Sequence, residues 1–167
     1  KVMDKIKISR RQLMGGAGGT VLVASAGGLI PQWAWAQEVV KLGLLHSLSG
    51  TIAIAEASLV DAEKMAVEEI NAAGGVLGKK IEIVLEDGAS ENTVFAEKAR
   101  KLLERDKVAA IIGCYTSASR KAVLPALAAN NGLLYYPTYY EGQEMDKHVI
   151  YPSQEATQSV VAASEWL

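Results

Sequence analysis

The sequence has few of the residues that build metal centres, disulfides and phosphate-binding loops. It contains one cysteine, Cys114, and two histidines, His46 and His148, among 167 residues. A single cysteine excludes an intramolecular disulfide. Neither histidine has a second histidine or a cysteine at metal-ligand spacing. No Gly-x-Gly-x-x-Gly or Walker-type run follows the first predicted strand, which disfavours nucleotide binding. We therefore expect no metal and no cofactor.

Positive charge is also scarce once the beginning of the chain is set aside. Residues 1–36 hold five of the 17 Lys and Arg residues and one of the 19 acids, so residues 37–167 carry 12 basic and 18 acidic residues, a net charge of −6. This balance argues against nucleic acid as a partner. Half of all residues are apolar, which is enough to bury the core of one domain.

Residues 1–36 have the layout of a signal peptide. A cationic start is followed by a mildly apolar, glycine-rich stretch over 13–30 and by the small-x-small sequence Ala34-Trp35-Ala36. A membrane-spanning helix is the alternative, but it needs about 20 strongly apolar residues. This stretch instead contains six glycines and is followed by Pro31. We expect cleavage after about Ala36, which leaves residues 37–167 as the mature part.

Arg10 and Arg11 resemble the paired arginines of the twin-arginine export motif, in the run Ser9-Arg10-Arg11-Gln12-Leu13-Met14. A receptor of the Tat translocase reads such a pair. The Tat translocase is therefore an expected partner during export, and the expected location of the mature protein is the periplasm.

The mature part alternates between strand patterns and helix patterns. Strands are predicted at 39–45, 80–86, 108–112, 132–136 and 149–151, and helices at 54–73, 93–104, 118–130 and 155–167. This alternation predicts an α/β fold with an open, mostly parallel sheet and helices on both faces. The alternating residues 80–86 suit a strand near the sheet edge, and the uniformly apolar 108–112 suits a central strand.

The helix predicted at 54–73 has a stripe of apolar residues at spacings of three or four. We expect this stripe to face the core. Its members are Leu59, Ala62, Ala66, Ile70 and Ala73.

Two polar loops follow neighbouring predicted strands, where ligands bind in open parallel sheets. The first loop, 113–119, leads into a helix, so its hydroxyls and the first N–H groups of the helix can face a cleft. These hydroxyls belong to Thr116, Ser117 and Ser119. The alternative is a plain helix cap made by the same residues.

The second loop, 135–142, holds four of the six tyrosines. In extended backbone, Tyr136, Thr138 and Tyr140 project to the same side. Aromatic walls with hydroxyl tips can sandwich a small planar ligand. An aromatic cluster that seals the fold is the alternative. Together the two loops predict a site for a small, neutral, planar and polar molecule.

Cys114 ends the third predicted strand and could act as a nucleophile with His46 across the cleft. The alternative is a small side chain that fills the core. Nothing in the sequence fixes an orienting partner for His46, so we expect a binding protein rather than an enzyme. A Cys-dependent amide hydrolase is kept as a remote alternative.

Five segments resemble the urea and short-chain amide binding proteins of branched-chain amino-acid-type ABC importers. These segments are 44–51, 74–80, 95–100, 113–121 and 136–142. The resemblance covers nearly all of 39–167. It implies the type I periplasmic-binding fold, with the flavodoxin-like strand order, and the permease subunits of an importer as membrane partners. Members of that family have a second lobe, so the chain resembles the N-terminal lobe of a longer protein.

The resemblance also implies which residues contact the ligand. Tyr115, Ser117, Tyr136 and Thr138 would line an amide pocket, with Ser117 supplying donors to the carbonyl oxygen. Tyr140 and Ser47 are added as candidates from the loops at the same sheet edge. The 136–142 loop is equally similar to a cytoplasmic amide sensor that controls an amidase operon. The signal peptide favours the exported importer component, which captures urea or a short-chain amide.

Overall fold

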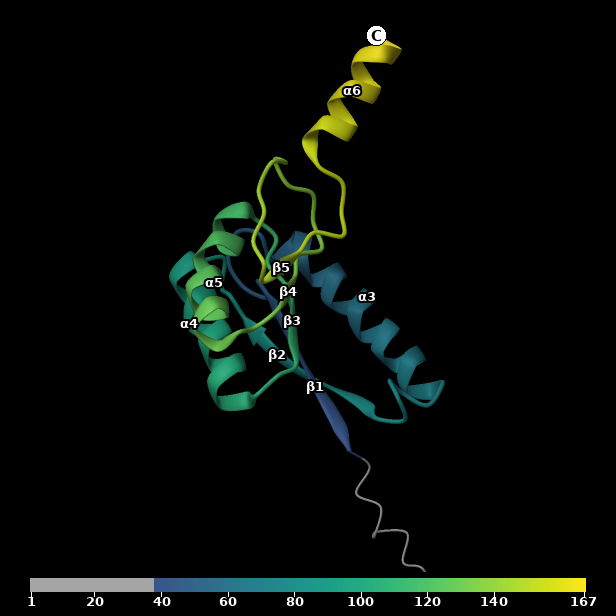
Figure 1. Cartoon of the computed structure of the whole chain (residues 1–167), viewed down its shortest axis with the longest axis vertical. Helices are drawn as coiled ribbons and strands as arrows, with labels where there is room; N and C mark the ends of the chain where they lie inside the picture. The colour runs from purple at the N-terminus through teal and green to yellow at the C-terminus, as the bar shows by residue number, and fades with distance from the viewer. Residues whose placement is uncertain (1–37) are drawn as a thin grey trace, which may run out of the picture. The chain divides into compact units, whose positions relative to one another are not determined.

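The structure is a computed structural model that describes residues 38–167 (Figure 1). The predicted signal peptide, with Arg10, Arg11 and the cleavage site after Ala36, lies outside the described residues. Export through the Tat translocase and the boundary at residue 36 therefore stay predictions.

Strands and helices alternate along the described chain. The elements in order are β1 (Val39–His46), α3 (Ala53–Ala72), β2 (Lys80–Asp87), α4 (Asn92–Lys101), the π-helical turn η2 (Leu102–Asp106), β3 (Ala110–Gly113), α5 (Ser117–Asn130), β4 (Leu134–Tyr135), β5 (Val149–Ile150) and α6 (Ala156–Trp166). Every strand and helix predicted in the mature part is present, with ends that differ by a few residues.

The five strands form one parallel sheet in the order β2-β1-β3-β4-β5. This is the flavodoxin-like order that the resemblance implied. It places β2 at the edge and β3 in the centre, as their residue patterns predicted. In the register of the sheet, His46 pairs with Asp87 and Leu45 pairs with Gly113. The carboxyl ends of β1, β2 and β3 therefore lie side by side, and their loops share one edge.

Helices cover both faces of the sheet, as predicted. Figure 1 shows α3 on one face and α4 with α5 on the other. The core lies mainly beneath α4 and α5, where fully buried side chains include Phe95, Leu102, Ile111, Leu127 and Leu134. None of the helices in residues 38–167 combines the length and the hydropathy that a membrane crossing needs.

The predicted inward face of α3 is wrong. Ala62, Ala66, Ile70 and Ala73 are exposed, and Leu59 is only half-buried. The buried residues are instead Glu56, Val60 and Val67. Most of the predicted stripe is alanine, which gains little from burial. The true stripe was hidden because it contains a glutamate whose charge is compensated by a partner from another element.

Pro125 lies inside α5, where its missing N–H removes one helical hydrogen bond. A smaller difference from the predicted elements concerns β4. β4 is shorter than the predicted strand 132–136 because Gly132 is still part of the helix ending, where its N–H donates to the carbonyl of Leu127.

Gly113 makes the turn from β3 into α5 possible. Its φ is +149°, and a Cβ at this position would lie 2.0 Å from the carbonyl oxygen of Leu45. Cys114, the next residue, also has a positive φ of 62°. The backbone therefore passes very close to β1 before it opens into the loop that starts α5.

We predict that Gly113→Ala lowers the free energy of unfolding by ~2 kcal/mol or more, because backbone must move to admit the methyl group. Gly78→Ala is the matched control, since Gly78 also has a positive φ (+79°) but its Cβ would meet nothing within 4 Å. It should cost only about 1 kcal/mol of backbone strain. Guanidinium chloride unfolding measures both. If both variants lose the same free energy of unfolding, the close packing of Gly113 against β1 does not contribute to stability.

Candidate functional site

A hollow of about 270 Å³ opens at the carboxyl ends of β3 and β4, beside the first turns of α5 and α6. It is lined by Tyr115, Thr116, Ser117, Tyr136, Tyr139, Tyr140, Glu141 and Ala156. The two loops that the sequence singled out thus form one concave surface.

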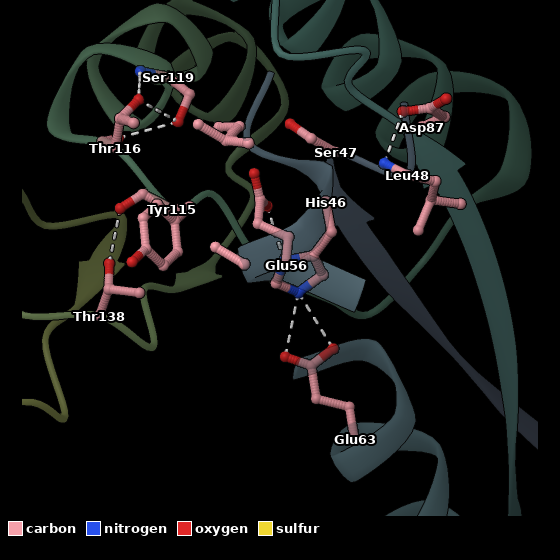
Figure 2. Close-up of polar contacts among 12 residues, drawn as sticks. His46, Ser47, Leu48, Glu56, Glu63, Asp87, Tyr115, Thr116, Ser119 and Thr138 are labelled. Carbon is pink, nitrogen blue, oxygen red and sulfur yellow. Dashed lines mark hydrogen bonds and ion pairs between the residues drawn. The ribbon is translucent and has the colours of Figure 1, made fainter. Parts of the chain in front are cut away.

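The carbonyl oxygen of Tyr115 joins these two loops. It accepts one hydrogen bond from the Tyr136 hydroxyl at 2.9 Å and another from Thr138 Oγ1 at 2.8 Å. The Thr138 bond is visible in Figure 2. These two hydrogen bonds hold the Tyr136 ring and the Thr138 side chain against the same backbone atom, and only Tyr136 is among the residues that line the hollow.

At the start of α5, the three candidate hydroxyls have separate roles. Thr116 is the N-cap, and its Oγ1 accepts from the N–H of Ser119 at 3.1 Å. Ser119 is buried and its hydroxyl donates back to the Thr116 carbonyl (Figure 2). The capping alternative is therefore right for these two residues. Ser117 alone directs its hydroxyl to another loop, where it donates to Glu141 Oε2 at 2.7 Å.

Glu141 gives the hollow a negative charge. The hydrogen bond from Ser117 is the main cause that lowers the pKa of this carboxyl, with smaller help from a backbone N–H and from nearby Arg120 and Lys121. Its side chain is otherwise exposed. The carboxylate is therefore ionised at neutral pH and can accept hydrogen bonds from a ligand.

Arg120 lies buried behind this surface, with a relative exposure of 1%. Its Nη1 donates to Ser117 Oγ at 2.9 Å, and its Nη2 donates to the Glu144 carboxylate. Its guanidinium carbon lies 4.7 Å from the centre of the Tyr136 ring. Arg120 lies in the 113–121 segment that resembles the amide binders, but no role for it was predicted from the sequence. Its spacing of three from Ser117 on a helix was the available signal.

The tyrosines form a wall on one side of the hollow. Tyr140 stacks on Tyr151 with ring centres 4.5 Å apart, and Tyr136 meets Tyr151 edge-on at 6.2 Å. Tyr136 is buried and Tyr140 half-buried, while Tyr139 is exposed. The predicted alternation of the 135–142 loop is confirmed. The aromatic side chains both pack on the core and line the hollow. The predicted aromatic wall and the predicted cluster that seals the fold are therefore formed by the same residues.

His46 is the centre of a second buried group of charges. Its Nδ1 lies 3.0 Å from Glu56 Oε2, and its Nε2 lies 3.1 Å from both oxygens of Glu63 (Figure 2). Burial of the ring disfavours the charged form, but the hydrogen bonds to the two carboxylates outweigh it and raise the pKa of His46 to about 9. His46 is thus an imidazolium that ties β1 to α3.

Cys114 does not have the environment of a nucleophile. Its thiol is completely buried, and this burial raises its pKa well above the ordinary range. His46, the expected partner, is engaged by Glu56 and Glu63. The thiol therefore stays protonated, and the interpretation of Cys114 as a core side chain is right.

Ser47 lies in a loop with its own internal hydrogen bonds. It is buried, and its Oγ accepts from the N–H of Ser90 at 3.1 Å. Asp87 holds the same loop through the N–H of Leu48 at 2.8 Å (Figure 2). Burial raises the pKa of the Asp87 carboxyl, but the hydrogen bonds from Ser49, Ala89 and Leu48 lower this pKa by a larger amount. The net shift of the pKa is therefore downward.

Of the six candidates, four line the hollow: Tyr115, Ser117, Tyr136 and Tyr140. Thr138 and Ser47 are not part of this lining, and their hydroxyls bind backbone groups. Ligand contact by any of the six stays a prediction. Over residues 38–167, no three His, Cys, Asp or Glu side chains come together as a metal site.

A scan of protein families matches residues 40–167 to the model described as "Periplasmic binding protein domain". The chain belongs to this family. One curated relative is Leu/Ile/Val-binding protein homolog 7 of Brucella melitensis, which is 34% identical over 116 residues, 70% of this chain and 29% of the relative.

Solved structures agree with the family. The substrate-binding protein LivJ of Streptococcus pneumoniae, in complex with isoleucine, matches with 33% identity and a TM-score of 0.58, over 59% of this chain and 28% of LivJ. A fatty acid transporter binding protein of Thermomonospora curvata matches with a TM-score of 0.65 and 22% identity, over 78% of this chain and 33% of its own, which shows the fold alone. These relatives are binding proteins by name, not enzymes.

The chain spans about 29% of that curated relative and 28% of LivJ. The predicted type I periplasmic-binding lobe is confirmed as the fold of the described residues.

The His46 group makes stability depend on pH in a defined window. The pKa of this histidine is raised on folding from 6.5 to about 9. Its stabilising contribution is therefore fully present below pH 6.5 and is lost as the pH rises through 9. We predict a loss of about 3 kcal/mol in the free energy of unfolding between these values.

Guanidinium chloride unfolding at pH 6 and at pH 9.5 tests this prediction, with His46→Gln as the variant. The variant should be less stable at pH 6 and should lack most of the difference between the two pH values. His148→Gln removes the other buried histidine, whose Nδ1 contacts the Gly132 carbonyl oxygen. If His148→Gln abolishes the difference and His46→Gln does not, His46 is not the group responsible.

Proposed function

We propose that this protein is the solute-binding component of an ABC importer, acts in the periplasm, and captures urea or a short-chain aliphatic amide for the permease subunits. Membership of the periplasmic binding protein family supports the binding role. The relatives' names support an ABC transporter of the branched-chain amino-acid type. The twin-arginine pattern at Arg10 and Arg11 supports export.

The observation that carries the ligand class is the combination of groups around the hollow. The N–H groups of Ser117 and Ala118 have no partner inside α5, because they lie in its first turn. They can donate to a carbonyl oxygen. The carboxylate of Glu141 can accept from an amide NH₂ group, and the tyrosine rings can contact the flat faces of the ligand. A neutral amide satisfies all three.

The charges around the hollow also favour a neutral ligand. The residues that line the hollow in the described chain include no Lys, Arg or His. The nearest guanidinium, Arg120, is buried and paired with Glu144. A ligand carboxylate at the start of α5 would lie beside the ionised Glu141 without a free cation to balance it. A neutral ligand avoids this repulsion.

Branched-chain amino acids are the second candidate. The relatives are named as Leu/Ile/Val-binding proteins, and the LivJ structure contains isoleucine. A zwitterion could place its carboxylate at the start of α5 and its ammonium group at Glu141. An amino acid bound in this way would use the same groups as the amide, so the two ligand classes must be distinguished by experiment.

The cytoplasmic amide sensor differs from the importer component by location rather than by ligand. A sensor with this site would bind the same amides. Export of a reporter protein fused behind residues 1–36 separates the two functions, because a cytoplasmic sensor has no use for such a segment.

Isothermal titration of the mature protein with urea, formamide, acetamide and leucine tests the proposal. We predict saturable binding of urea or an amide and at least tenfold weaker binding of leucine. Ser117→Ala should weaken amide binding about fivefold to tenfold, since it removes one hydrogen bond that orients Glu141.

Ser164→Ala on α6 is the control for Ser117→Ala, because Ser164 is exposed and bonds only its own helix. It should bind as the wild type does. Tight binding of leucine with no response to urea or amides would move the protein to the amino-acid class. Release of ammonia during the titration would contradict a binding role altogether.

A further inference from the structure

We propose that Arg120 is a positioning residue that sets the donor and acceptor pattern of the hollow, by fixing Ser117, Glu141 and Tyr136 together. This inference rests on the proposed function, since it assigns Arg120 a part in ligand binding. Arg120 is not itself among the residues that line the hollow.

The first step is the direction of the Ser117 hydroxyl. Its oxygen accepts from Arg120 Nη1 at 2.9 Å, so its own hydrogen must point elsewhere. It points to Glu141 Oε2, 2.7 Å away. Arg120 has no acceptor atom, so this order cannot reverse. Ser117 is therefore held as a donor, and Glu141 is held as the acceptor that faces the ligand.

The second step concerns Glu141, whose side chain is 66% exposed. An exposed glutamate normally samples several rotamers. Here it is held by Ser117 and lies 3.9 Å from Arg120 Nη2, which adds attraction in the same direction. A buried residue thus fixes the position of a surface carboxylate, and a fixed acceptor loses less entropy when it binds a ligand.

The third step is the aromatic wall. The guanidinium lies over the Tyr136 ring at 4.7 Å and over the Tyr151 ring at 5.4 Å. Tyr140 stacks on Tyr151, so its position depends indirectly on the same guanidinium. Arg120 also donates to Glu144, in the loop that carries Glu141. One planar group therefore positions both the polar side and the aromatic side of the hollow.

Lysine should not replace this function. The guanidinium donates to Ser117 and to Glu144 from two different nitrogens while its plane contacts an aromatic ring. An ammonium group is a compact charge without this fork. Arg120→Lys keeps the charge, protects the fold from an unpaired Glu144, and removes the geometry that positions Ser117.

A double-mutant cycle between Arg120 and Glu141 tests the proposal, with the best ligand among urea, acetamide and leucine. Glu141→Gln should weaken binding about tenfold in the wild type but less than about twofold in Arg120→Lys, where the carboxylate is no longer held. Arg120→Met should give the same pattern if it folds. Arg100→Met, on the exposed side of α4, is the control and should keep the tenfold effect.

If Arg120 only stabilised the fold, Glu141→Gln would cost the same factor in every background, and the proposal would be overturned. A second measurement needs no ligand. NMR titration of the Glu141 carboxyl should give a pKa that is higher in Arg120→Lys than in the wild type and unchanged in Arg100→Met. If the wild type binds none of the three ligands, the proposed function fails, and this titration alone decides: an unchanged pKa in Arg120→Lys overturns the role of Arg120.

Discussion

The site depends on one constraint: the charged side chain of Arg120 is buried away from water. A buried guanidinium is tolerated only if acceptors and polarisable groups surround it. Ser117, Glu144 and the faces of two tyrosines supply these groups from α5, from the 141–144 loop and from the ends of β4 and β5. The loops that border the hollow must therefore meet at one point, and the polar and aromatic side chains they carry become fixed relative to one another.

The fold could be predicted from sequence because its signals are local and repeated. The alternating residues of 80–86 and the uniform apolar run of 108–112 placed β2 at the edge and β3 in the centre, which the strand order confirms. The face of α3 could not be predicted, because Glu56 occupies a buried position. Its burial depends on His46, a partner ten residues earlier in another element, and periodicity carries no information about such a pair.

The site was predicted in part. The Gly113–Ser119 and Tyr135–Gly142 segments were found because polar residues and tyrosines follow strands whose ends share an edge. The assignment of single hydroxyls was less successful, since Thr116 and Ser119 cap α5 and Thr138 binds the Tyr115 carbonyl. Each choice depends on angles within a turn rather than on residue type. Arg120 was missed because a charged residue inside a helix normally faces solvent.

The hollow beside α5 is proposed as an amide site whose polar groups are already in place before the ligand arrives. A crystal structure of the protein with acetamide is the decisive test. We expect a ligand carbonyl oxygen at the first-turn N–H groups of α5, the ligand NH₂ group at Glu141, and a Ser117–Arg120 contact unchanged from 2.9 Å. Acetamide bound elsewhere, or bound only after Glu141 has left Ser117, would contradict it.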